Sequence, residues 1–146
     1  LMGLGSETVI ETLYLIENKI ASTKIQDGST DLKTAHKLNK ENCKIDWTQS
    51  GISIYNLIRG LSPYPTAWFV LKDQEKELNA KVYKAKWEEE LHAFKIGTIV
   101  SDKTTLKVAV ENGFITLLEL QLPGKKMMSS KDILNGTTFS PDAMAY

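Results

Sequence analysis

Two apolar runs joined by Asn112-Gly113 constrain the fold of this chain more than any other feature of its sequence. Apolar residues alternate with other residues over Leu106–Val110, and a second apolar run continues over Phe114–Leu122. Asn-Gly between two such runs is the strongest short-range signal of a β-hairpin, because both residues of the tightest turn need positive φ. We therefore expect an antiparallel pair of strands here.

Similar patterns predict three short strands ahead of the hairpin, at Ala67–Leu71, Lys81–Trp87 and Gly97–Val100. Along the middle strand, alternation places aromatic residues on one face and lysines on the other: Tyr83, Ala85 and Trp87 against Lys84 and Lys86. Five or so short strands separated by turn signals are typical of a small barrel or sandwich. The fold class expected is mainly β with short helices.

Two helices are predicted before the strands. Apolar residues recur at helical spacing over Glu7–Ile20, where Ser6 can act as the N-cap. A second helix is expected at roughly 49–61, capped by Thr48 or Asp46.

A third, short helix is expected after the hairpin. Ser129 with Asp132 three residues further on forms a capping box, and Asn135-Gly136 would stop the helix. The tail, Thr137–Tyr146, is expected to be loosely held.

The domain organisation follows from these segments. Residues 1–31 form a helical segment, residues 32–45 are rich in lysine with little apolar content and indicate an extended linker, and residues 46–146 form the β domain. Because the chain begins at Leu1 rather than Met, we expect a fragment of a longer protein.

The formal net charge of zero hides an asymmetry, because residues 1–31 carry a net charge of −3 and residues 32–146 a net charge of +3. A weakly basic domain of this kind lacks the strongly basic stripe that indicates nucleic-acid binding by itself. Cys43 is the only cysteine, so no internal disulfide can form and a reducing, cytoplasmic location is expected. No apolar run approaches the ~20 residues that a bilayer-spanning helix needs.

The sequence contains no recognisable active site. It has no glycine-rich phosphate loop, no nucleophile elbow and no paired catalytic histidines. His36 and His92 have no partners at metal-ligand spacing, so we expect no metal site and no bound cofactor, and both histidines are interpreted as solvated surface residues. Glu88–Glu90 is interpreted as a solvated acidic turn.

Lysine clusters are the remaining candidates for function: Lys37, Lys40 and Lys44; Lys81, Lys84 and Lys86; and Lys125 with Lys126. Exposed lysines often only keep a domain soluble, but three such groups could also converge on one face of a small barrel. There they would contact phosphates, where counterion release drives binding. Arg59 could pair with phosphate or complement the helix dipole. Trp47 and Trp68 are interpreted as core residues rather than ligand contacts.

Five segments, in sequence order, resemble the C-terminal domain of the methionyl-tRNA formyltransferase family: Ala35–Glu41 with Ile45-Asp46-Trp47, Ile58–Trp68, Lys81–Ala85, Lys95–Ile99 and Gly124–Asn135. The match departs from the family pattern at Gly60, where Ala is usual, and at Thr66, where Gly is frequent. The similarity runs from about Thr34 to Asn135, and the segment before it, residues 1–31, is similar to the end of the family's catalytic domain and its linker.

The resemblance implies a fold and a function. The fold would be an oligonucleotide-binding-like (OB-like) β-barrel that holds initiator methionyl-tRNA, while an N-terminal catalytic domain in the same protein transfers a formyl group from 10-formyltetrahydrofolate to its amino group. By resemblance, Lys37 and Lys40 would be linker contacts to the tRNA backbone. Candidates on the domain itself would be Lys84, Lys125 and Lys126. None of the family's catalytic residues has a counterpart here, so this part alone is expected to be inactive.

Other interpretations stay open. A related formyltransferase acting on an amino sugar or on formyl-folate could share this barrel, although the Gly124–Asn135 segment favours the tRNA enzyme. The domain could also be a structural brace for the catalytic domain, with lysines scattered over its surface. A free-standing binding module is disfavoured by the acidic, apolar first helix.

Overall fold

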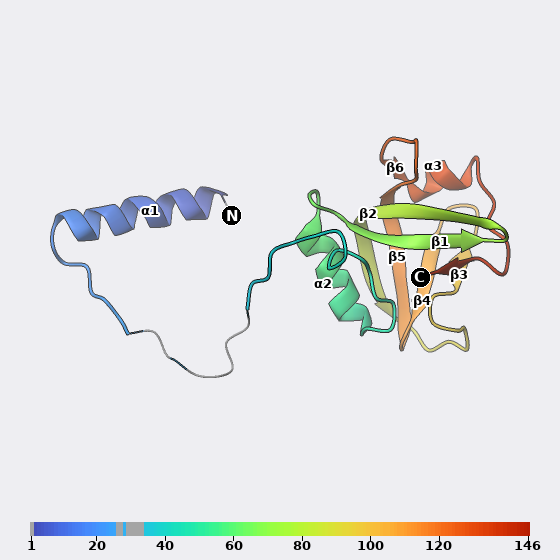
Figure 1. Cartoon of the computed structure of the whole chain (residues 1–146), viewed down its shortest axis with the longest axis horizontal. Coiled ribbons are helices and arrows are strands. Elements are labelled where there is room, and N and C mark those ends of the chain that lie inside the picture. The colour runs from blue at the N-terminus through green and yellow to red at the C-terminus, as the bar shows by residue number, and fades with distance from the viewer. Residues whose placement is uncertain (1, 26–27, 29–33) are drawn as a thin grey trace. The chain divides into compact units, whose positions relative to one another are not determined.

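The computed structural model describes residues 2–25, 28 and 34–146. The chain divides into two compact units, Leu1–His36 and Lys37–Tyr146, each drawn in Figure 1. The domain boundary that we expected between residues 31 and 32 lies outside the described residues.

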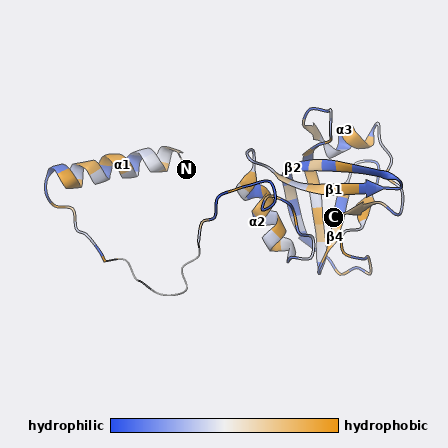
Figure 2. Cartoon of the chain, in the orientation of Figure 1, coloured by the Kyte–Doolittle hydropathy of each residue, from blue (hydrophilic) through white to orange (hydrophobic). Residues whose placement is uncertain are grey.

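Among its described residues, the first unit contains one helix, α1 (Met2–Glu17). It begins earlier and ends sooner than predicted. The hydroxyl of Ser6 donates to the carbonyl of Gly3 at 2.8 Å, so Ser6 lies inside the helix and the predicted N-cap was wrong. Lys19 has a positive φ of 55° just after the helix, where the chain leaves the helical path. No residue of α1 is buried in this unit, and Figure 2 shows hydrophobic residues distributed along it.

The second unit is built on one antiparallel sheet with the strand order β3-β4-β5-β2-β1-β7, and β6 pairs with the outer part of β5. The strands are β1 (Ala67–Asp73), β2 (Lys76–Glu89), β3 (Ile99–Ser101), β4 (Leu106–Val110), β5 (Gly113–Gln121), β6 (Met128–Ser129) and β7 (Met144–Ala145). The sheet curls around a single hydrophobic core (Figures 1 and 2). The predicted mainly β, barrel-like fold is confirmed.

The C-terminal tail closes this barrel. Thr98 and Met144 form an antiparallel bridge, and the amide of Ala145 donates to the carbonyl of Gly97 at 2.8 Å. Ala143 and Ala145 are buried at 0% and 3% exposure. The expectation of a loosely held tail was therefore wrong, because small residues in the tail fit into the core and complete the backbone hydrogen bonds of the sheet.

The hairpin predicted at Asn112-Gly113 is confirmed by the pairing of β4 with β5. The backbone of the turn differs from the prediction, in which both turn residues have a positive φ. Asn112 has a positive φ of 61°, whereas Gly113 does not. A Cβ at Gly113 would meet the carbonyl oxygen of Glu88 and the ring of Trp87. The glycine is therefore required by close packing, and the turn geometry is carried by Asn112.

Helix α2 (Gly51–Leu61) covers the core with Ile54, Ile58 and Leu61. Its N-cap is Ser50, whose hydroxyl accepts from the amide of Ser53. The caps predicted at Thr48 or Asp46 were wrong.

Asp46 instead forms the turn ahead of α2. Its carboxylate accepts from the amide of Thr48 at 3.0 Å and from the Thr48 hydroxyl at 2.7 Å. Hydrogen bonds to the carboxylate hold the pKa of Asp46 below its ordinary value, and the bond from the Thr48 hydroxyl contributes most.

The short helix predicted after Ser129 is confirmed as α3 (Ser130–Leu134). The Ser129 hydroxyl accepts from the amide of Asp132, as a capping residue does.

The segment 37–45 belongs to the second unit. Cys43 and Ile45 are buried at 2% and 1% exposure, and the backbone of this stretch lies along β1. The amide of Ile45 donates to the carbonyl of Trp68 at 2.8 Å, and the amide of Trp68 donates to the carbonyl of Cys43 at 3.1 Å. The backbone beside Lys44 is therefore held against the sheet by these hydrogen bonds and by the burial of Cys43 and Ile45.

Candidate nucleic-acid interface

Trp68 lies at the centre of the surface on which the lysines gather. Its neighbours Ala67 and Phe69 point into the core with 0% exposure, so the alternation of β1 directs Trp68 to the outer face of the sheet. The indole Nε1 donates to the carbonyl of Lys40 at 2.7 Å. The ring is half-buried, unlike Trp47, which lies in the core at 4% exposure and packs edge-on against Phe69. The core interpretation was right for Trp47 but only partly right for Trp68.

Two lysines of the preceding segment lie over the Trp68 ring. The Nζ atoms of Lys40 and Lys44 are 5.3 Å and 5.7 Å from the ring centroid. Attraction between an ammonium and the face of an indole is worth about 0.5–1 kcal/mol at an exposed site. These contacts favour positions in which both charges stay beside the ring and in reach of solvent.

Lys81 adds a third charge from the neighbouring strand. It pairs with Trp68 of β1 on one side and with Gln121 of β5 on the other, so the three side chains share the outer face. The Gln121 side chain donates to the carbonyl of Lys125 at 2.8 Å, which ties the loop after β5 to the same level of the sheet. We call Lys40, Lys44 and Lys81, beside Trp68, the basic row.

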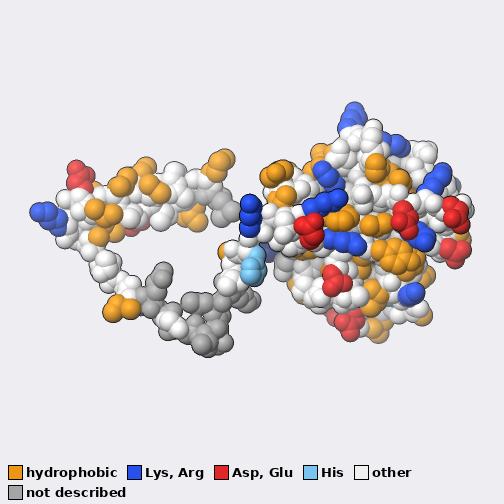
Figure 3. Space-filling view, in the orientation of Figure 1, with side chains coloured by type: hydrophobic (Ala, Val, Ile, Leu, Met, Phe, Trp, Pro, Cys, Tyr) orange, Lys and Arg blue, Asp and Glu red, His pale blue; other side chains and the backbone are white. Residues whose placement is uncertain are grey.

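The basic row is not neutralised by carboxylates. Within the part of the chain that the structure describes, none of its three lysines forms an ion pair. Figure 3 shows basic and hydrophobic side chains next to one another on the face of this unit that carries β1 and β2, with acidic side chains nearby. Charge and an aromatic surface are thus combined, as in sites that hold nucleic-acid strands.

The other predicted basic residues lie in different surroundings. Lys37 is exposed, and its carbonyl accepts from the side chain of Asn42 at 2.8 Å. Lys84 is 3.7 Å from the carboxylate of Glu119. Lys126 lines a hollow that also contains Glu119 and Asp132.

Arg59 is exposed on α2. Its Nε donates to the Asn56 side chain at 2.8 Å, and its guanidinium carbon is 5.9 Å from the centroid of the Tyr55 ring. Two of the predicted site residues lie at the basic row. Lys40 belongs to it and is held by the hydrogen bond from Trp68, and Lys125 is held next to it by the hydrogen bond from Gln121.

A β-bulge changes the faces predicted for β2. The register against β5 shifts on both sides of Lys84, so Val82 and Ala85 both point into the core. Tyr83 lies on the outer side, where its hydroxyl donates to the side chain of Gln121 at 3.0 Å. The predicted shared face of Tyr83 and Ala85 was wrong, because one extra residue reverses the alternation.

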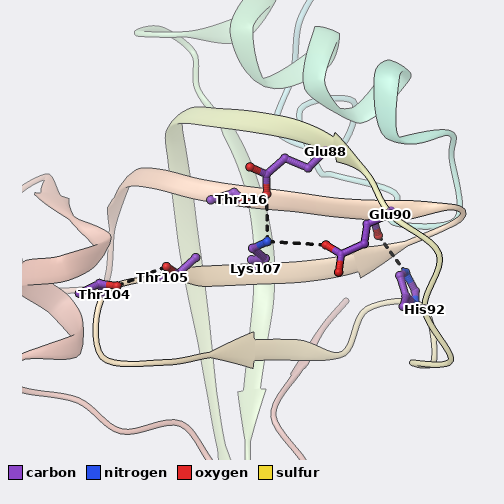
Figure 4. A network of polar contacts seen from close by, with 8 residues as sticks. Glu88, Glu90, His92, Thr104, Thr105, Lys107 and Thr116 are labelled. Carbon is purple, nitrogen blue, oxygen red and sulfur yellow. Dashed lines mark hydrogen bonds and ion pairs between the residues drawn. The ribbon is translucent and has the colours of Figure 1, made fainter.

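The far end of β2 carries a polar network in place of the predicted solvated acidic turn. Glu88 lies 3.0 Å and Glu90 3.9 Å from the ammonium of Lys107, and the Thr116 hydroxyl donates to Glu88 at 2.7 Å (Figure 4). The pKa of Glu88 is held below its ordinary value. The hydrogen bond from the Thr116 hydroxyl is the largest cause, and the hydrogen bond from Lys107 is the next.

His92 belongs to the same end of the sheet. Its Nε2 donates to the carbonyls of Val110 and Gly113, each at 2.9 Å, and its ring centroid lies 4.5 Å from that of Phe114. The solvated role predicted for His92 was wrong, since the ring joins the two strands of the hairpin. His36 is exposed, as expected.

Lys44 and Lys81 were predicted only as members of the lysine clusters and were not assigned a tRNA contact, and Trp68 was interpreted as a core residue. The signal for Trp68 was present in the sequence, because a tryptophan between Ala67 and Phe69 on a strand with a buried face must point outward. The register that pairs it with Lys81 depends on the turn between β1 and β2 and carries no local signal of its own.

Comparison with known proteins agrees with this fold. The family described as the C-terminal domain of formyl transferases matches residues 37–138, which begin where the second unit begins. A methionyl-tRNA formyltransferase of Flavobacterium johnsoniae is 59% identical over 146 residues, covering 100% of this chain and 46% of the relative. The corresponding protein of Flavobacterium psychrophilum is 48% identical over 146 residues, with the same coverage.

A methionyl-tRNA formyltransferase of Bacteroides fragilis is 41% identical over 141 residues, covering 93% of this chain and 44% of the relative. The chain thus spans less than half the length of these relatives. None of the helices among the described residues is long and apolar enough to cross a membrane. The resemblance inferred from the motifs is confirmed, and this chain belongs to the formyl transferase family, of which it carries the C-terminal domain.

Proposed function

We propose that this chain is the C-terminal part of a methionyl-tRNA formyltransferase, and that this part binds initiator tRNA through the phosphate backbone. The names of its relatives support the first half of the proposal. The observation that carries the second half is the basic row, in which Lys40, Lys44 and Lys81 converge around Trp68 without carboxylate partners among the described residues.

Phosphate contacts of this kind act without reading the sequence. Each lysine that neutralises a phosphate releases a condensed counterion, so binding weakens as salt rises. Such contacts fix the position of the nucleic acid, while base identity is read by other groups. The barrel would thus grip tRNA, and recognition of the initiator would rest elsewhere.

The remaining predicted residues are proposed as further phosphate contacts. Lys37 and Lys125 lie in the segments held next to the basic row. Lys84 and Lys126 are expected to contribute less, because carboxylates beside them lower the local potential. Arg59 would contribute from α2.

The activity proposed for the whole protein is transfer of a formyl group from 10-formyltetrahydrofolate to the amino group of the methionyl-tRNA. The donor is a substrate of that reaction, and no residue of this chain is assigned to it. Binding energy supplied by the barrel, remote from the reacting amine, would orient the amine for attack on the formyl carbon. The apolar side chains exposed along α1 support a further partner in the same protein, its N-terminal catalytic domain.

Titration of labelled initiator tRNA with the chain, followed by anisotropy from 20 to 200 mM salt, tests the proposal. The variant Lys40→Ala/Lys44→Ala/Lys81→Ala should bind weakly and should reduce the slope of log K against log salt by about 2–3. A matched control removes the same charge outside the basic row, as Lys76→Ala/Lys86→Ala/Lys103→Ala. Equal weakening by both variants, or no binding by the parent at 20 mM salt, would contradict the proposed grip.

A further inference from the structure

A hollow of about 510 Å³ lies beside the basic row. Its walls come from the segment before α2, from the loop after α2 and from the outer faces of β1 and β2, and they include Lys40, Tyr64, Trp68, Asn79 and Lys81. Its size falls in the range of small-molecule sites. Among the described residues no carboxylate lines it, so an anionic group that enters the hollow meets the nearby lysines without a carboxylate in the wall.

Tyr64 is the most exposed aromatic residue of this hollow, at 87% exposure. The backbone that carries it is nevertheless fixed. Prolines precede and follow it, and each restricts φ to a narrow range. Thr66 closes the loop, since its amide donates to Leu61 at 2.9 Å and its hydroxyl to Pro63 at 2.6 Å. A flat ring is thus presented to solvent by a loop that is already ordered, which lowers the entropy cost of binding against it.

The polar groups of the hollow fit a nucleotide. Lys40 and Lys81 lie on its rim from two different segments, and Trp68 holds the Lys40 carbonyl through its indole N–H. Asn79 offers both an amide donor and an acceptor, the pair of groups that can bind the edge of a base. An exposed ring, an amide and two lysines together provide contacts for the face and the edge of a base and for a phosphate.

We propose that this hollow binds one unpaired nucleotide of the RNA, with its base stacked on Tyr64 and its phosphate between Lys40 and Lys81. The inference rests on the proposed function and adds to it a contact that a base inside a paired stem cannot make, because both of its faces are stacked on the neighbouring base pairs. Stacking of a base on an aromatic side chain is a sequence-tolerant contact. The stacking contact therefore discriminates unpaired from paired RNA rather than one base from another.

The test compares two RNA probes with equal numbers of phosphates, one a fully paired stem and the other a stem with an unpaired loop. Tyr64→Ala should weaken binding of the looped RNA about tenfold and leave the paired stem unchanged. The slope against salt should stay as in the parent, because no charge is removed. Tyr64→Phe, which keeps the ring, should restore the affinity, and Asn79→Ala should weaken only the looped RNA.

The failure of this inference can be distinguished from the failure of the tRNA grip. If Tyr64→Ala binds looped RNA as tightly as the parent while both remain salt-sensitive, the nucleotide site is overturned and the phosphate grip stands. Equal weakening for both probes also overturns the site, because it indicates a loss that does not depend on an unpaired base. If the parent binds neither probe at low salt, both proposals fall.

Discussion

Two places on the barrel bring lysine ammonium groups to an aromatic ring, and they differ in their carboxylates. Lys40 lies 5.3 Å from the centroid of the Trp68 ring, and Lys107 lies 5.4 Å from that of Phe114. Lys107 is also 3.0 Å from Glu88 and 3.9 Å from Glu90. Lys40 forms no ion pair among the described residues. An aromatic neighbour is therefore common to both lysines, and the carboxylates beside Lys107 are what separate the two places.

The two places share strand β2, with Lys81 toward one end and Glu88 at the other. Around Lys107, the carboxylates of Glu88 and Glu90 lie within ion-pair distance of the ammonium, so its charge is compensated and its attraction for a phosphate is weakened. Around Trp68, three ammonium groups leave the local charge positive. We therefore expect substitutions at the Lys107 end to change stability and substitutions at the Trp68 end to change RNA binding.

The largest effect is expected from Gly113→Ala, at the Lys107 end. A Cβ there would meet the carbonyl oxygen of Glu88 and the ring of Trp87, so β2 and β5 would have to move apart. We expect a loss of about 3 kcal/mol in the free energy of unfolding, measured by urea denaturation. Gly60→Ala is the control, because no atom lies within 4 Å of its added Cβ. That exposed helical position should gain about 0.5–1 kcal/mol. Similar losses in both variants would show that packing at Gly113 is not the cause.

A smaller effect is expected from Lys107→Met, which removes the shared partner of Glu88 and Glu90. The free energy of unfolding should fall by about 1.5 kcal/mol, an ion pair and a charged hydrogen bond together, reduced by solvent screening. Lys81→Met is the matched control, because it makes the same substitution at a lysine of the basic row in the same sheet. It should leave thermal unfolding unchanged and weaken RNA binding instead. If Lys107→Met impaired RNA binding and Lys81→Met impaired stability, the distinction drawn between the two places would be reversed.

The smallest effect is expected from Thr116→Val, which keeps the shape of the side chain and removes its hydrogen bond to Glu88. The loss should be about 0.5–1 kcal/mol at neutral pH. Because the pKa of Glu88 is lowered from 4.5 in the folded protein, the stabilisation is fully present above that value and disappears as pH falls through the folded pKa. The difference between parent and variant should therefore shrink in acid. Thr116→Ser should retain the pH dependence, and a difference that stayed constant down to acid would exclude Glu88 as its source.

Local patterns were sufficient for much of the fold. The hairpin around Asn112, the strands before it and the cap at Ser129 all depend on neighbouring residues, so a short stretch of sequence carries the whole signal. The bulge at Lys84 and the burial of Ala143 and Ala145 depend on distant partners. Alternation alone could not predict either of them.

The candidate site was likewise predictable from the sequence only in part. Lysine clusters are visible in the sequence, and Lys40 was expected to contact RNA. Which lysines meet carboxylates depends on strand register, and this separates Lys107, with its two glutamates, from Lys81 beside Trp68. The sequence shows which residues carry charge, but it does not show which of the lysines lack a carboxylate partner.

The sequence by itself determined the β-rich class, the antiparallel hairpin and the family of this chain, because alternation, turn chemistry and ordered motifs are local properties. Only the tertiary structure decided that the tail closes the barrel, that Lys44 and Lys81 lie beside Trp68, and that Lys107 is paired with carboxylates. Those outcomes depend on which strands lie side by side and in what register. Pairing between distant segments is fixed by the burial of the whole core, and no single stretch of residues contains it.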